Sequence, residues 1–298
     1  MKAVQIKQYG GPEVLEVVDL PAPTAGDGQV LVRVTAATVN PVDAFTRNGF
    51  TQELAPGIEL PVTPGWDLAG TADHRRVAVM LQWFEGTGSG AQAEQVAVDA
   101  ADLAEVPDGV DDVTAAAVPL NGLTARQALD LLALQQGDVV LVTGASGAVG
   151  GFAVQLAALA GAHVLAVGSF DDEEWLNGLG AKEVLARAEA EQLVAQVRER
   201  HPDGIAAVLD AAPAGGLIGA VRDGGRYVTV IDPLVPAAER GIAPVKVNVQ
   251  PSGPQLSELL QLVGDGRLTV RVAGTLPLEQ VREAHEATGL RGKLVLTL

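Results

Sequence analysis

Three evenly spaced glycines form the stretch of the chain that is most informative about chemistry, Gly144-Ala-Ser-Gly147-Ala-Val-Gly150. They follow a short apolar run, 138–143, typical of a strand buried on both faces, and precede an apolar segment, 152–160, typical of a buried helix. Free amides and the positive end of the helix dipole attract an anion at such a junction. The stretch therefore predicts a phosphate-binding turn. Gly144 would make the turn, Gly147 would let the phosphate approach, and Gly150 would let helix and strand pack closely.

The context of these glycines matters because their spacing, G-x-x-G-x-x-G, differs from the usual G-x-G-x-x-G. Helical stretches at 172–178 and 189–200 alternate with further strand-like runs. Those runs lie at the intervals that βαβ units require, at 163–167, 183–186, 206–211 and 226–231. The pattern predicts a doubly wound parallel sheet with a nucleotide site. The alternative is a parallel sheet whose glycines serve only packing.

Composition limits the classes of protein to consider. A length of 298 residues favours two domains, and a hydrophobic content of 48% with 3% aromatic residues means that Ala, Val and Leu fill the core. Neither a membrane span nor a signal peptide is recognisable, so we expect a cytoplasmic protein. The net charge of −17 argues against nucleic acid as a partner. The absence of cysteine excludes disulfides, thiolate nucleophiles and cysteine-based zinc sites.

The N-terminal part of the chain has a different rhythm, with short strand-like runs separated by turn residues. Residues 2–7 and 14–18, joined through Gly-Gly-Pro, predict a hairpin, and further strand-like runs lie at 29–36, 77–80 and 94–98. This part predicts a separate small β-domain. Towards the C-terminus the sequence predicts a short last strand at 245–249 and two amphipathic helices at 255–263 and 278–288.

Segments spread over nearly the whole chain resemble one known family in the family's own order. They are YGGPEVLEV at 9–17, QVLVRVTAATVNPVDAFTRNG at 29–49, PGWDLAGT at 64–71, GAQAEQVAV at 90–98, PLNGLTARQAL at 119–129, TGASGAVGGFAVQLA at 143–157, GLGAKEVL at 178–185, GGRYV at 224–228 and RGKLVL at 291–296. Together they resemble the zinc-independent medium-chain dehydrogenases/reductases, in the quinone oxidoreductase branch that includes zeta-crystallin.

The resemblance implies an α/β architecture of two domains. A GroES-like β-domain would contain residues 1–118 with 252–298, a Rossmann dinucleotide-binding domain would contain residues 119–251, and the active cleft would lie between them. Relatives often pair through edge strands, so a homodimer is expected. Zinc-dependent relatives carry a Cys in the segment matching 40–43 and a His-Glu pair where this chain has Trp66-Asp67. We therefore expect no metal.

The activity that the resemblance implies is hydride transfer from NADPH to a small-molecule acceptor. Without a metal to polarise an alcohol, a quinone or an α,β-unsaturated carbonyl (an enone, enal or enoyl compound) suits, because its β-carbon is already electrophilic. The alternative is a non-catalytic NADP(H)-binding sensor or structural protein on the same scaffold. Phe45 and Thr51 stand where many relatives have tyrosines, which keeps that alternative open.

Asn40 and Asp43 are the predicted catalytic residues. By resemblance the Asn40 amide faces nicotinamide and substrate, whereas turn chemistry alone would make it an ordinary turn residue. A structural role is the alternative for Asp43, which would pair with Arg47 or cap the next turn. Thr124 resembles a threonine that hydrogen-bonds the cofactor, with a helix cap as the alternative. Lys293 would support the cofactor end of the cleft, or would be a solvated basic residue.

The choice of cofactor depends on the end of the strand 163–167. Gly168-Ser169 stands where NAD-binding folds usually have an acidic residue, and Arg187 follows the next strand, which favours NADPH over NADH. The acidic run 171–174 would repel a phosphate if it faced inward, or would form the first turn of a helix. The predicted cofactor-binding residues are Thr124, Gly144, Ala145, Ser146, Gly147, Ala148, Val149, Gly168, Ser169, Arg187, Ile231 and Lys293.

The acceptor pocket is the least determined part of the prediction. Phe45, Phe50, Trp66 and Trp83 are expected to form an apolar wall for a flat acceptor, with core packing as the alternative for these aromatic residues. Only ADHRR joins Thr71 to Val77, where relatives have a longer hairpin. This short connection predicts a more open substrate site.

Overall fold

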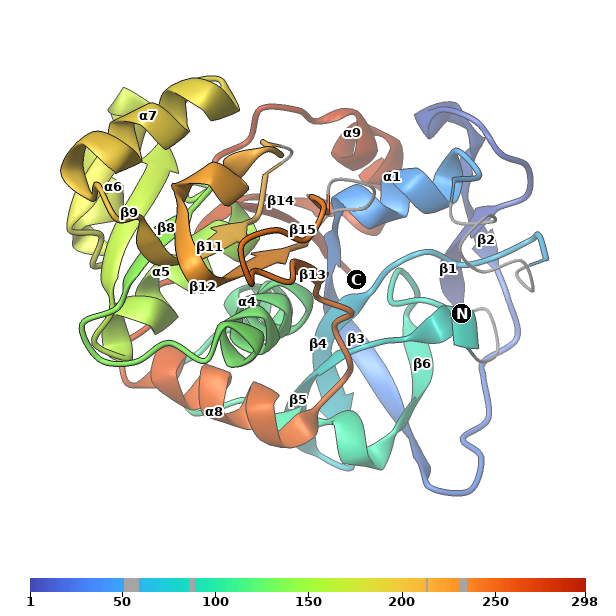
Figure 1. Cartoon of the computed structure of the whole chain (residues 1–298). Coiled ribbons are helices and arrows are strands. Elements are labelled where there is room, and N and C mark those ends of the chain that lie inside the picture. The colour runs from blue at the N-terminus through green and yellow to red at the C-terminus, as the bar shows by residue number, and fades with distance from the viewer. Residues whose placement is uncertain (51–58, 86–88, 213, 231–234) are drawn as a thin grey trace. The chain divides into compact units, whose positions relative to one another are not determined.

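The chain divides into two compact units in the computed structural model (Figure 1). The structure describes residues 1–50, 59–85, 89–212, 214–230 and 235–298. Unit 1 contains Met1–Leu123 and Gln250–Leu298, and unit 2 contains Thr124–Val249. None of the described helices is both long enough and apolar enough to cross a membrane.

Unit 2 contains a six-stranded parallel sheet in the order β10-β9-β8-β11-β12-β13. Its strands are β8 (Val139–Val142), β9 (His163–Gly168), β10 (Glu183–Ala186), β11 (Ile205–Asp210), β12 (Val221–Thr229) and β13 (Val245–Lys246). The chain winds from β8 out to β10, returns to the other side of β8, and continues to β13. This order confirms the predicted doubly wound sheet. The direction in which successive strands are added reverses between β8 and β11, and we call the carboxyl ends of these two strands the switch point.

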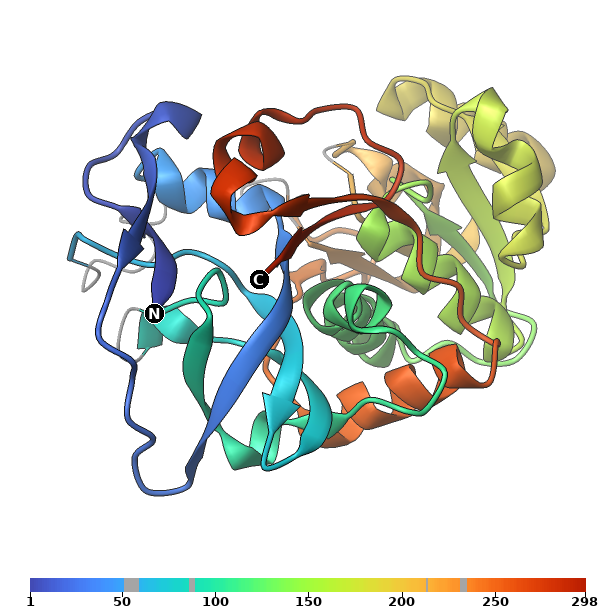
Figure 2. The ribbon, with the colours of Figure 1, turned by 180° about the vertical axis from the view of Figure 1, so that it is seen from behind.

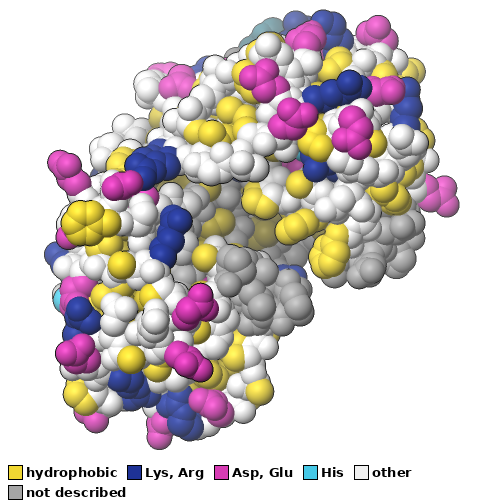
Figure 3. Space-filling model, turned by 90° about the horizontal axis from the view of Figure 1, so that it is seen from above, with side chains coloured by type: hydrophobic (Ala, Val, Ile, Leu, Met, Phe, Trp, Pro, Cys, Tyr) yellow, Lys and Arg dark blue, Asp and Glu magenta, His cyan; other side chains and the backbone are white. Residues whose placement is uncertain are grey.

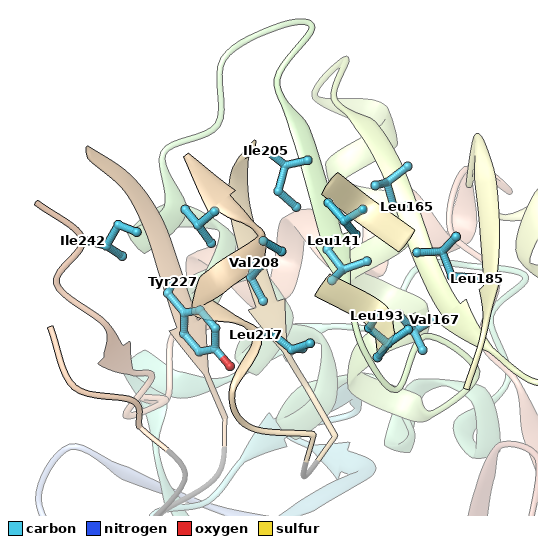
Figure 4. Packing of buried hydrophobic residues seen from close by; sticks show 13 residues of the cluster. Leu141, Leu165, Val167, Leu185, Leu193, Ile205, Val208, Leu217, Tyr227 and Ile242 are labelled. Atoms are coloured by element: carbon cyan, nitrogen blue, oxygen red, sulfur yellow. The ribbon is translucent and has the colours of Figure 1, made fainter. Parts of the chain in front are cut away.

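Helices cover both faces of this sheet. On one face, α7 (Ala190–Arg200) and the 3-10 turn η5 (Leu217–Ala220) pack on a cluster of buried residues that includes Leu141, Val208 and Tyr227 (Figure 4). Neighbouring residues of a strand point to opposite faces. The other face receives α5 (Ala148–Leu159), which packs against β8 and β9. The turn η4 (Phe170–Asp172) and α6 (Glu173–Gly178) follow β9, and α4 (Pro119–Leu132) contains the boundary between the units.

Unit 1 is built mainly of antiparallel strands. The predicted hairpin is present as β1 (Lys2–Ile6) and β2 (Leu15–Asp19), joined through the turn η1 (Pro12–Val14). A seven-stranded sheet has the order β14-β15-β3-β4-β5-β7, with β6 paired to β3. Its strands are β3 (Gln29–Val39), β4 (Asp67–Ala72), β5 (Arg75–Met80), β6 (Gln95–Asp99), β7 (Ala104–Glu105), β14 (Val272–Pro277) and β15 (Lys293–Thr297).

The C-terminal strands β14 and β15 belong to the same sheet as β3, β4 and β5 from the N-terminal part of the chain. β15 pairs antiparallel with β3, and Figure 2 shows these C-terminal strands beside the N-terminal ones. The helices and 3-10 turns of unit 1 are α1 (Pro41–Arg47), η2 (Trp83–Glu85), η3 (Ala100–Asp102), α3 (Asp112–Ala116), α8 (Gly253–Gly264), η6 (Leu278–Gln280) and α9 (Val281–Glu286). The helix predicted at 278–288 is therefore shorter, because it begins as a 3-10 turn and Ala287 takes extended backbone.

The short connection between β4 and β5 is a tight hairpin turn. Asp73 and His74 both have positive φ, at 46° and 65°. Two successive left-handed residues match the twist of paired strands, and β4 and β5 pair without interruption from Asp67 with Met80 to Ala72 with Arg75. The greater openness of the substrate site stays a prediction.

Surface charge is mixed on the face of the molecule shown in Figure 3, where acidic and basic side chains are interspersed. Among the described residues on that face, lysine and arginine form no continuous band. The acidic excess, with a net charge of −17, is thus not gathered into one patch there.

Candidate active site

The glycine turn between β8 and α5 has the predicted geometry. Gly144 has a φ of +57°, in the left-handed region that favours glycine. Gly147 is the N-cap of α5, so the first amides of a twelve-residue helix face the turn. A Cβ atom added to Gly150 would lie 2.2 Å from the Gly144 carbonyl oxygen. Only glycine lets α5 begin this close to the turn.

Ser146 gives the turn a buried hydroxyl group that is free to bind a ligand. It is 8% exposed, and its Oγ has no hydrogen-bond partner within the part of the chain that the structure describes. A Cβ atom on Gly168 would lie 3.0 Å from this Oγ and 2.5 Å from Leu176 Cδ1. Buried hydroxyl groups are nearly always paired, so an unpaired one beside a helix N-terminus fits the oxygen of a bound dinucleotide.

The end of β9 carries the residues that were predicted to select the cofactor. Ser169 Oγ donates a hydrogen bond to Asp172 Oδ2 at 2.7 Å, and Asp172 is buried. Glu173 and Glu174 form the first turn of α6, where the helix dipole favours acidic residues. The Arg187 side chain is exposed, while its backbone N–H donates to the Gly168 carbonyl at 3.1 Å.

The other predicted cofactor residues have varied surroundings. Ala145 is fully buried, and Ala148 and Val149 lie half-buried in the first turn of α5. Thr124 is buried within α4 and not at its start, so it is not the N-cap of that helix. Ile231 lies outside the described residues.

Asp43 is a buried cap in unit 1. Its Oδ2 accepts from the Asn40 backbone N–H at 2.7 Å, and its Oδ1 accepts from the Gly65 N–H at 3.0 Å. These bonds join the start of α1 to the segment before β4. Of the two structural roles considered for Asp43, the structure confirms the cap. Arg47 makes other contacts, with its Nε donating to the Gly10 carbonyl at 3.2 Å.

The Asn40 amide is saturated by hydrogen bonds within unit 1. Its Nδ2 donates to Thr38 Oγ1 at 3.0 Å and to Asp67 Oδ1 at 2.9 Å. Its Oδ1 accepts from Lys293 Nζ and, at 3.4 Å, from Asn121 Nδ2. An amide has two donor hydrogens and two acceptor lone pairs, and Asn40 is only 3% exposed. Contact with a nicotinamide or an acceptor would require one of these bonds to open.

We call Thr38, Asn40, Asp43, Asp67, Asn121 and Lys293 the polar cluster. Lys293 is buried and not solvated, and its Nζ also donates to the Val39 carbonyl at 3.1 Å. Burial raises the pKa of Asp43 to about 7, and the Asp67 charge acts in the same direction while the backbone donors oppose it. Burial lowers the pKa of Lys293, opposed by the charges of Asp67 and Asp43. The cluster thus holds one ammonium group and two carboxyl groups away from water.

The predicted aromatic wall is divided into two groups. Phe45 and Phe50 are 48% and 46% exposed, with ring centroids 5.6 Å apart. Trp66 and Trp83 are buried with centroids 6.2 Å apart, and Phe84 lies 4.9 Å from Trp66. The exposed pair is open to a ligand, whereas the tryptophans also serve core packing.

Several members of the polar cluster were not among the predicted site residues. Thr38 and Asn121 gave no sequence signal, because their contacts join distant parts of the chain. Asp67 did have a sequence signal, because Trp66-Asp67 occupies the place of the His-Glu pair of zinc-dependent relatives.

Comparison with known proteins identifies relatives along the whole chain. Family models for an alcohol dehydrogenase GroES-like domain and a zinc-binding dehydrogenase match residues 26–108 and 179–296. The quinone oxidoreductase of Sus scrofa is 31% identical over 330 residues, covering 100% of this chain and 98% of its own. An NADPH-dependent alkenal/one oxidoreductase of Arabidopsis thaliana is 29% identical, covering 99% of this chain and 79% of its own. A mycobacterial protein solved in complex with NADPH is 27% identical, with a TM-score of 0.84 and full coverage of both chains.

The polar cluster does not fit the zinc ion that one of these family models implies. The chain has no cysteine, and the Lys293 ammonium group lies in the cluster, where it would repel a cation. Both Asp67 oxygens already accept hydrogen bonds. Among the described residues, no group of three His, Cys, Asp or Glu side chains could hold a metal.

Proposed function

Because this chain belongs to the quinone oxidoreductase family of the medium-chain dehydrogenases/reductases, we propose that it transfers a hydride from NADPH to a quinone or an α,β-unsaturated carbonyl without a metal. The observation that supports cofactor binding most directly is the glycine turn, where the Ser146 hydroxyl has no hydrogen-bond partner among the described residues. The names of the relatives, quinone oxidoreductase and alkenal/one oxidoreductase, support the class of acceptor.

Bound NADPH would supply the hydride, and the chain's own groups would bind and orient the reactants. The first amides of α5 and the Ser146 hydroxyl suit the pyrophosphate, because both are donors at the positive end of a helix. Negative charge develops on the acceptor oxygen during hydride addition, so hydrogen-bond donors near it lower the barrier. Asn40 is the candidate donor, and the polar cluster would hold it in place.

Cofactor preference rests on the end of β9. A Cβ atom at position 168 would lie 2.5 Å from Leu176 Cδ1, so an acidic residue for the ribose hydroxyl groups would fit there only if the Leu176 side chain moved. Asp172 is buried and accepts a hydrogen bond from Ser169, whereas the Arg187 side chain is exposed and its backbone N–H donates to the Gly168 carbonyl. We propose that Arg187 binds the 2′-phosphate of NADPH. Arg187→Ala should lower kcat/KM for NADPH by about tenfold and leave NADH unaffected. Equal turnover of wild-type protein with both cofactors would refute this preference.

Acceptor reduction is tested directly by the loss of NADPH absorbance with one quinone, one short enone and one enal. The wild type is compared with Asn40→Ala, and with Asn48→Ala as an exposed control in the same segment. Turnover that falls in Asn40→Ala while NADPH still binds would establish a reductase and place Asn40 in the site. Activity that survives treatment with a chelator supports the metal-free reaction.

A second candidate function is a non-catalytic NADP(H)-binding sensor. The saturated Asn40 amide favours it, because that amide has no free position for an acceptor. Tight NADPH binding without turnover of any acceptor in the panel would support it. We further propose a cytoplasmic homodimer, and light scattering in solution measures the assembly.

A further inference from the structure

A buried polar network joins three strands of unit 2 at the switch point of its sheet. Asp210, the last residue of β11, accepts on Oδ1 from Thr143 Oγ1 at 2.5 Å. Its Oδ2 accepts from the Tyr227 hydroxyl at 2.9 Å and from the Gly215 N–H at 3.1 Å. Thr143 Oγ1 accepts in turn from the Ala212 N–H at 3.1 Å. Thr143, Asp210 and Tyr227 are all buried.

The network connects two backbone segments that meet at this point. Thr143 directly precedes the glycine turn, whereas Ala212 and Gly215 follow β11. The two segments touch, since a Cβ atom on Gly144 would lie 3.0 Å from the Ala211 carbonyl oxygen. A change in the network would therefore move the glycine turn and the segment after β11 relative to each other.

Tyr227 holds the network from β12, the strand next to β11. Its ring belongs to the buried cluster of the sheet, and Figure 4 shows its hydroxyl oxygen directed away from Ile242. Burial raises the pKa of Tyr227, and the charge of Asp210 acts in the same direction. The phenol therefore stays protonated and keeps donating to the carboxylate.

We propose that Tyr227, Asp210 and Thr143 are positioning residues for the nicotinamide half of the dinucleotide. A doubly wound sheet binds a dinucleotide across its switch point, with the adenosine ribose at the end of the second strand, here β9. The network lies on the other side, at β11 and β12, so it holds the segments that the second half of the ligand would meet. The inference deepens the proposed function and depends on dinucleotide binding by unit 2.

The test compares two ligands in isothermal titration calorimetry on the full chain, NADPH and 2′,5′-ADP, which lacks the nicotinamide half. Tyr227→Phe removes one donor from a buried carboxylate and keeps the ring. It should raise the Kd for NADPH about tenfold and change the Kd for 2′,5′-ADP less than about twofold. Thr143→Val removes the hydroxyl group that bonds to Asp210 and Ala212. It should likewise weaken the binding of NADPH more than that of 2′,5′-ADP.

The matched control is Val197→Ala, a core truncation in the same cluster that lies on α7, away from Tyr227 and the turns. It should lower Tm without changing either Kd, which separates positioning from general loss of stability. An equal loss of affinity for both ligands in Tyr227→Phe, or no loss for either, would overturn the inference. The proposed function would still stand in that case, provided that the wild-type protein binds NADPH. Wild-type protein that bound neither NADPH nor NADH would overturn both.

Discussion

The glycine turn of unit 2 and the polar cluster of unit 1 differ in how far their polar groups are hydrogen-bonded within the protein. In the turn, backbone and small side chains leave the first amides of α5 and the Ser146 hydroxyl to a ligand. In the cluster, the Asn40 amide and both Asp67 oxygens are already bonded within the chain. The turn is thus complete only with a ligand, whereas the cluster is complete without one. Changes in the turn should alter ligand binding, and changes in the cluster should alter stability together with any turnover that depends on Asn40.

The largest effect is expected for Lys293→Met. It removes the buried ammonium group that donates to Asn40 and whose charge interacts with those of Asp67 and Asp43, and removing one member of a buried charged group typically costs about 3–5 kcal/mol of unfolding free energy. Urea denaturation measures the loss. Lys7→Met is the control, because Lys7 pairs with Glu16 in water and should change stability far less. Similar losses in the two variants would contradict the view that the cluster is a buried electrostatic unit.

Gly150→Ala should come next. Its Cβ atom would lie 2.2 Å from a backbone oxygen, and such overpacking costs about 1–3 kcal/mol and displaces the turn proposed to bind NADPH. Gly151→Ala is a matched control in the same helix, because its Cβ atom would meet Ala145 O at 3.7 Å and Leu179 Cδ1 at 3.8 Å, in ordinary contact. The control should be neutral or slightly stabilising. NADPH titration and thermal melting measure both variants, and equal behaviour would refute the packing role of Gly150.

The pH dependence of stability should reveal Asp43. Its folded-state pKa of about 7 exceeds that of the unfolded chain, so the folded protein binds the additional proton. The unfolding free energy should therefore fall as pH rises from about 4 to 7, by up to about 1.4 kcal/mol per pH unit. Asp43→Asn should flatten this slope, and the exposed control Asp108→Asn should keep it. A slope unchanged in Asp43→Asn would mean that the backbone donors outweigh burial.

The smallest effects are expected for two serine variants, one of which should change only NADPH binding and the other only stability. Ser146→Ala removes a hydroxyl without a partner among the described residues, so it should leave the stability of the free protein unchanged and raise the Kd for NADPH about fivefold. Ser252→Ala removes the N-cap of α8 and should cost about 1 kcal/mol of stability with no change in that Kd. A stability loss in Ser146→Ala would show that the hydroxyl is not reserved for a ligand.

The sequence was informative where a feature is made of neighbouring residues. The glycine turn and the alternation of strands and helices in unit 2 are local patterns, and they predicted the doubly wound sheet and the roles of Gly144 and Gly150. The capping role of Asp43 was likewise among the alternatives, because Asn40 and Asp43 lie three residues apart.

The partners of Asn40 could not be predicted in the same way. They come from Thr38, Asp67, Asn121 and Lys293, which only the pairing of β3 with β4 and β15 and the start of α4 bring together. Burial reversed the expected character of Lys293 for the same reason. Asp210 did give a signal that was not used, since an acidic residue that ends an otherwise apolar strand must find donors inside the protein.

β3 and its partner β15 are far apart in the sequence, so the ribosome makes the two strands at different times. Unit 2 is one continuous segment, Thr124–Val249, which leaves the ribosome before Lys293 is made. Asp43 and Asp67 are therefore synthesised long before Lys293, whose charge acts on both. The nascent chain would contain all of unit 2 before β15 is available to complete the sheet of unit 1.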